Sequence, residues 1–76
     1  AGPVKAGLYL QVAAVGKAEA DVVSKVLRSK GFAVNIAPVG DDKTFRVLVG
    51  PLERDNLGKT RGELTGLGFS PFPRTI

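Results

Sequence analysis

The chain has 76 residues and a formal net charge of +4, a length that corresponds to one small domain. It has no cysteine and no histidine, which excludes disulfides and thiolate metal sites and removes the commonest general base and metal ligand. The 7 acidic residues form no pair at a catalytic spacing. We therefore expect a binding module with no catalytic residues, no metal and no cofactor, and the modest positive charge favours anionic partners.

No apolar stretch is long enough to span a membrane, and no secretory signal is visible. Residues 1–6, which begin Ala-Gly-Pro, are expected to be a linker, and residues 7–76 to form the domain. We interpret the chain as part of a longer protein, in which targeting or anchoring segments lie outside this domain.

The sequence repeats itself once, at a shift of 37 residues. Leu10 aligns with Val47, and the Gly-Phe pair at 31–32 aligns with the Gly-Phe pair at 68–69. The aligned core candidates are apolar in both halves. This pattern indicates two copies of one supersecondary unit, because a solenoid would need three or more.

The first unit is predicted to be a strand, a helix and a strand. Residues 8–13 alternate in the manner of a half-buried strand, residues 17–30 carry one apolar stripe of a helix, and residues 32–39 alternate again. Gly31 provides the left-handed residue that ends the helix. Residues 40–43, Gly-Asp-Asp-Lys, are typical turn residues and join the two units.

The second unit follows the same order. We expect a strand over 45–50 and a helix over 55–67, with Asp55 as its N-cap. Three glycines spaced four residues apart make this helix weak, since each costs about 1 kcal/mol relative to alanine. A last strand over 69–74 contains two prolines, which places it at an edge of the sheet.

The resulting order is β-α-β-β-α-β, the split βαβ arrangement of ferredoxin-like and RNP-like α+β domains. Right-handed crossovers place both helices on one face of a four-stranded antiparallel sheet of order 4-1-3-2. The other face is then left without a helix.

Alternation predicts which side chains point to this helix-free face. On the last strand we expect Ser70, Phe72 and Arg74 to face that way. Aromatic faces stack on sugar rings or bases, and amides and arginine form hydrogen bonds, so the face suits an extended, polar, ring-bearing polymer. The candidate binding residues are Tyr9, Gln11, Ala13, Asn35, Arg46, Leu48, Gly50 and Phe72.

Two segments resemble a known family. Residues 8–13, Leu-Tyr-Leu-Gln-Val-Ala, are similar to the first strand of SPOR (sporulation-related repeat) domains, in which an aromatic-rich strand carries a glutamine. Residues 45–52, Phe-Arg-Val-Leu-Val-Gly-Pro-Leu, resemble the family's third strand, aromatic-Arg-Val-x-Val-Gly-Pro-aromatic. The similarity covers residues 7–74, which is nearly the whole chain.

The resemblance implies the fold inferred above and a non-catalytic module that binds septal peptidoglycan, specifically glycan strands stripped of stem peptides. It implies a bacterial, periplasmic or cell-envelope location at the cell-division septum, in a host protein that is membrane-anchored or exported. Gln11 and Arg46 match motif residues, and Tyr9 matches an aromatic position beside the glutamine. Ala13, Val15 and Leu48 depart from the family pattern, which often has glycine, phenylalanine and a basic residue there, in that order. We expect this module to be a monomer.

Two other functions stay open at this point, because a fold alone does not assign function. The RNA recognition motif has the same strand order, but it stacks bases on aromatics of both central strands. Phe45 has the parity of a core residue, so we expect no nucleic-acid partner. Small βαββαβ domains also dimerise through the sheet or bind small effectors, and Leu48 and Ala13 on the helix-free face would suit such packing.

Overall fold

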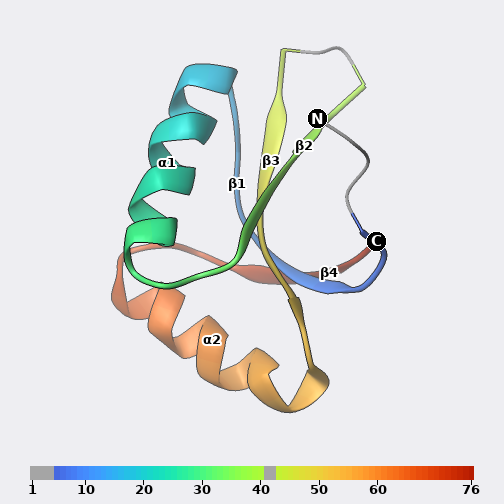
Figure 1. The fold of residues 1–76 in the computed structure, drawn as a ribbon, viewed down its shortest axis with the longest axis vertical. Helices are drawn as coiled ribbons and strands as arrows, with labels where there is room; N and C mark the ends of the chain where they lie inside the picture. The colour runs from blue at the N-terminus through green and yellow to red at the C-terminus, as the bar shows by residue number, and fades with distance from the viewer. Residues whose placement is uncertain (1–4, 41–42) are drawn as a thin grey trace.

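The computed structural model describes residues 5–40 and 43–76. Its elements in chain order are β1 (Leu8–Val15), α1 (Lys17–Ser29), β2 (Val34–Pro38), β3 (Phe45–Leu52), α2 (Arg54–Gly66) and β4 (Phe72–Thr75). The strands form one antiparallel sheet of order β2-β3-β1-β4, and both helices lie on the same side of it (Figure 1). The predicted fold and strand order are therefore confirmed. Residues 1–4 of the expected linker, and Asp41 and Asp42 of the expected turn, lie outside the described residues.

The core lies between the sheet and the two helices. It is built from apolar side chains of β1, β2 and β3 and from one stripe of each helix, as the periodicities predict. Its buried members are Leu10, Ala20, Leu27, Val34, Val47, Val49 and Leu64. The glycine-containing helix α2 buries only Thr60 and Leu64. Within the described ranges, no helix is long and apolar enough to cross a membrane.

Both helices end in the same way. After α1 the N–H of Phe32 donates to the carbonyl oxygen of Leu27, and after α2 the N–H of Phe69 donates to that of Leu64, each at 3.1 Å. The glycine before each phenylalanine has a positive φ, 92° and 96°, which is the Schellman ending. The repeated Gly-Phe pairs therefore belong to the helix ends, and β2 begins at Val34, later than predicted.

Helix α2 begins one residue earlier than predicted. Its N-cap is Glu53, which has an extended backbone (φ −77°, ψ 149°) and makes no capping hydrogen bond with its side chain. The helix starts there because β3 continues to Leu52, two residues beyond the prediction, so that one residue separates strand from helix. Asp55 lies in the first turn, where its carboxylate interacts favourably with the positive end of the helix dipole.

Both edge strands are protected against pairing with a further strand. Gly7 and Ile76 exchange two backbone hydrogen bonds, of 3.2 and 2.9 Å. Since bonded pairs alternate along an antiparallel ladder, Pro73 faces the free edge of β4, where it has no N–H to offer. On β2, the carbonyl oxygen of Val34 already accepts from Nη2 of Arg28 at 3.2 Å. Such edges discourage strand addition.

One buried hydroxyl weakens the core. Oγ of Ser24 on α1 is buried and has no hydrogen-bond partner among the described residues, and an unpaired buried group costs about 1–3 kcal/mol. We expect Ser24→Ala to leave the free energy of unfolding unchanged or to raise it by about 1 kcal/mol in urea denaturation. Ser29→Ala in the same helix is the comparison, because the exposed hydroxyl of Ser29 donates to the carbonyl oxygen of Val26 at 2.6 Å, a bond that Ser24 lacks. A loss of more than about 1 kcal/mol in Ser24→Ala alone would contradict the unpaired state.

Candidate functional site

Cross-strand pairing shows which side chains share the helix-free face. Leu48 of β3 pairs with Asn35 of β2 and with Gln11 of β1, and Gln11 pairs with Phe72 of β4. Directly paired residues of an antiparallel sheet lie on one face, so these four form a row across the sheet, which we call the central row. Strands lie about 4.8 Å apart, so the row is about 14 Å long. The structure thus brings together four of the candidate binding residues.

An arginine lies on each side of the central row. On one side Arg46 of β3 pairs with Ala37 of β2 and Ala14 of β1. On the other side Arg74 of β4 pairs with Tyr9 of β1. The parity predicted for Phe72 and Arg74, on the helix-free face, is confirmed by this register. The strand begins only at Phe72, later than predicted, so Ser70 lies outside it.

Ala13 does not lie on this face, contrary to the prediction. The register between β1 and β3 shifts between Gln11 and Ala13, so β1 carries an extra residue there. Val12 and Ala13 consequently both pack against the helix-side core, and the exposed Ala14 takes the position beside Arg46. Strict alternation fails at a bulge, because the extra residue interrupts the period of two.

Tyr9 is also placed differently from the prediction. Its side chain is 0% exposed, and its hydroxyl donates to the backbone carbonyl oxygen of Lys5. Its ring lies against Gly50: a Cβ added at Gly50 would lie 3.1 Å from Cδ2 of Tyr9 and 3.0 Å from backbone atoms of Leu8 and Leu52. The ring fills the space between Gly50 and the chain before β1, so it offers no free face for stacking.

Gly50 and Asn35, both candidate binding residues, contact each other. Nδ2 of Asn35 donates to the carbonyl oxygen of Gly50 at 3.0 Å, and Gly50 is buried with a φ of 139°. The register of β3 shifts here as well, between the partners of Leu8 and Leu10. The asparagine therefore anchors the irregular part of β3 from the neighbouring strand.

The exposed aromatic side chain of this face is Phe72, at 45%. Cζ of Arg74 lies 5.9 Å from the centroid of its ring, which is a cation–π distance. Nε of Arg74 donates to Oε1 of Gln11 at 2.7 Å. Gln11 itself is only 7% exposed. Arg74 was expected on this face but was not among the candidate binding residues; its shared parity with Phe72 was the signal that could have identified it.

A family model described as the SPOR domain matches residues 5–75. The chain belongs to the SPOR domain family. SPOR domains are non-catalytic modules of the bacterial cell envelope that bind septal peptidoglycan. No curated protein and no solved structure matched the chain.

The helix-free face of this SPOR domain offers little apolar surface for packing against a second sheet. Leu48 is fully buried although it lies outside the helix-side core cluster, and Ala13 packs on the other side. These are the two residues on which the dimerisation alternative depended. The RNA alternative is not favoured either. Base stacking of that kind needs exposed aromatic rings on both central strands, whereas the exposed ring described on this face, Phe72, lies on the edge strand β4.

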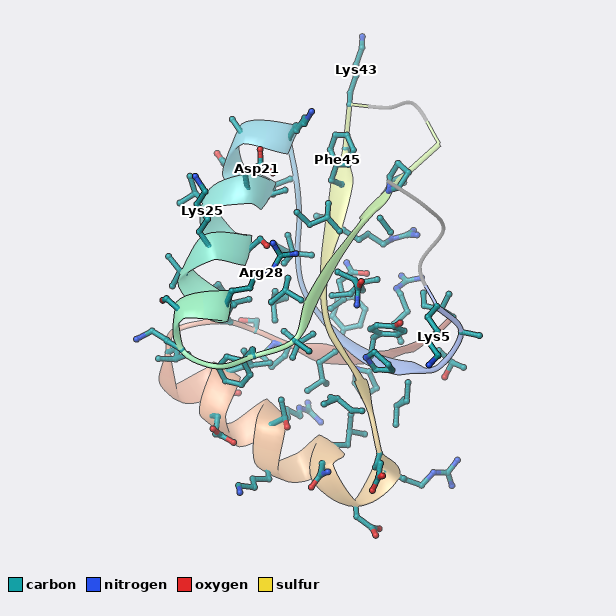
Figure 2. The ribbon with its side chains drawn as sticks, viewed as in Figure 1. Lys5, Asp21, Lys25, Arg28, Lys43 and Phe45 are labelled. Carbon is teal, nitrogen blue, oxygen red and sulfur yellow. The ribbon has the colours of Figure 1, made fainter. Side chains whose placement is uncertain are left out.

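The charges of the SPOR domain are distributed unevenly. The described acidic residues all lie on the helices or directly before α2: Glu19, Asp21, Glu53, Asp55 and Glu63. Figure 2 shows Asp21 and Lys25 on α1, across the molecule from Lys5. The strand residues described on the helix-free face include two arginines and no carboxylate, so this face favours neutral polar or anionic ligands. No group of three or more acidic residues in the described ranges could hold a metal ion.

The close contact at Gly50 predicts that a side chain at this position destabilises the fold. Gly50→Ala must move backbone atoms or the Tyr9 ring and adopt a φ of 139°, so we expect a loss of about 1–3 kcal/mol in the free energy of unfolding. Gly58→Ala is the matched control, because nothing lies within 4 Å of its added Cβ and alanine favours helix α2 by about 1 kcal/mol. Equal effects of the two substitutions in urea denaturation would show that Gly50 is not constrained.

Proposed function

We propose that this SPOR domain binds glycan strands of peptidoglycan on its helix-free face, prefers strands stripped of stem peptides, and so holds its host protein at the division septum. The observation that carries this proposal is the central row with an arginine on each side. The row presents a half-exposed aromatic ring and amide groups on a face whose described residues include no carboxylate. The domain acts as a monomer without catalysis, and its host protein is membrane-anchored or exported.

The residues of the row divide into contacts and support. Phe72 offers its ring to a sugar ring, while Arg46 donates hydrogen bonds to hydroxyl, acetamido or carboxylate oxygens. Asn35 is half-buried and offers its amide oxygen, because its Nδ2 is bonded to Gly50. Gln11, only 7% exposed, offers the edge of its amide group.

A buried layer lies below these contacts. Tyr9, Leu48 and Gly50 are buried. Because their side chains do not project from the face, a glycan strand can approach the sheet closely. A bare glycan strand can lie along such a row, whereas bulky stem peptides would hold it away.

The affinity of a single domain should be modest. Each neutral hydrogen bond contributes only about 1 kcal/mol net, and most polar groups of the row are already partly engaged within the protein. Several contacts must therefore act together, along more than one sugar of the strand.

The direct test is a pull-down with purified peptidoglycan sacculi, both untreated and after amidase removal of the stem peptides, beside a poly-uridine control. We expect selective retention by the stripped sacculi, because only a bare strand lies close to the row. Retention by neither wall sample would refute the proposal, and retention by the RNA would favour the nucleic-acid alternative.

Arg46→Gln should weaken binding to stripped sacculi by about tenfold or more, since it removes a charge-assisted hydrogen-bond donor. The matched control is Arg61→Gln, which removes the same charge from the exposed surface of α2 and should bind like the wild type. Circular dichroism and urea denaturation check that both variants fold. Equal binding by the two variants would remove Arg46 from the site.

A further inference from the structure

Arg74 is the most firmly positioned cation of the helix-free face. Its Nε donates to Oε1 of Gln11 at 2.7 Å, its Cζ lies 5.9 Å from the ring centroid of Phe72, and its backbone is paired with Tyr9. Arg46, by contrast, has no side-chain hydrogen bond within the described residues that would orient it. The guanidinium is held by two contacts on a residue whose backbone is fixed in the sheet, so it keeps one orientation, which lowers the entropy cost of binding a ligand.

The hydrogen bond to Gln11 occupies one edge of the Arg74 guanidinium and leaves the terminal nitrogens able to bind a ligand. The group has five N–H donors, and the bond engages the one on Nε. The two terminal nitrogens have no acceptor among the described residues, and the strand residues described on this face include no carboxylate. Two parallel N–H groups on the terminal nitrogens match both oxygens of one carboxylate.

Gln11 and Phe72 indicate which groups a ligand of Arg74 needs besides the carboxylate. The oxygen of the Gln11 amide is occupied by Arg74, so the amide presents its N–H₂ group as a donor. Phe72 is 45% exposed, and the guanidinium lies over one face of its ring. A ligand that fills this cluster needs an anionic oxygen pair, a nearby acceptor, and an apolar ring face. A sugar that bears a carboxylate has all three.

We propose that Arg74 is a carboxylate receptor and that it selects glycan strands by the charge of their free carboxyl groups. This inference rests on the proposed function. In peptidoglycan the stem peptide is joined through an amide bond to the lactyl group of the glycan. Removal of the peptide by an amidase hydrolyses this bond and leaves a free, ionised carboxylate on the sugar. Arg74 therefore binds stripped strands through a carboxylate on the sugar itself, at a position where intact strands carry a neutral amide, in addition to any steric exclusion of the peptide.

The decisive experiment changes the ligand and leaves the protein intact. Soluble stripped glycan is compared with the same glycan after its carboxyl groups have been coupled to methylamine with a carbodiimide, which gives a neutral amide of small size. We expect the wild-type domain to bind the amidated glycan about tenfold or more weakly, which is the effect of losing a bidentate ion pair. Binding to the untreated stripped glycan should also weaken as salt is raised.

The outcomes separate this inference from the proposed function. Equal wild-type binding to both glycans would overturn the carboxylate receptor while supporting glycan binding on this face. Wild-type binding to neither glycan would overturn the proposed function and the inference together. Weaker binding to the amidated glycan supports both.

Two variants of Arg74 and one of Arg46 assign the effect to a residue. Arg74→Lys keeps the charge but loses the planar fork that bonds Gln11 and a carboxylate at once, so it should lose most of the tenfold preference. Arg46→Lys is the matched control, since Arg46 is not held by a comparable contact, and it should keep the preference. Arg74→Gln should bind both glycans equally weakly. A preference that persists in both Arg74 variants, with folding verified by circular dichroism, would assign the carboxylate to another residue.

Discussion

The ring of Tyr9 fits into the helix-free face only because residue 50 has no side chain. A Cβ there would meet two backbone atoms at 3.0 Å and the ring at 3.1 Å. The rest of the site depends on this contact. Tyr9 pairs with Arg74, and Arg74 holds the amide of Gln11, so the buried ring supports the strand pair that carries the exposed cluster. A small domain buries a limited fraction of its surface, and this sheet gains burial on both of its faces.

The two helices, which cover the other face of the sheet, end in the same way because the sequence is repeated. Each half ends its helix with a glycine in the left-handed region followed by a phenylalanine that closes the last turn, and both phenylalanines pack against the core. The two central strands also carry their register shifts at nearly corresponding positions, 12–13 and 50–51. The repeat thus extends from the hydrophobic pattern to the irregularities that curve the sheet.

The resemblance of two strands to the SPOR pattern and the geometry of the sheet both direct our proposal to the helix-free face. The family motif contributes Gln11 and Arg46, which lie on separate rows of the helix-free face. The structure adds Arg74 and shifts the exposed aromatic ring from the centre of the sheet to the edge strand β4. A ligand on this face would therefore contact the region around β4 and β1 most closely, where the ring, the amide and the oriented guanidinium lie together.

The sequence by itself determined the order of the elements, the topology and the side of the sheet on which Gln11, Asn35, Arg46 and Phe72 lie. These properties follow from hydrophobic periods, glycines and prolines, which are local in the chain. The tertiary structure alone decided that Ala13 turns toward the core, that Tyr9 is buried, and that Gln11 binds Arg74. A bulge is defined by the pairing of two strands, and burial is defined by every segment that packs around a side chain. The bond between Gln11 and Arg74 joins residues 63 positions apart, a separation that no local pattern in the sequence can reveal.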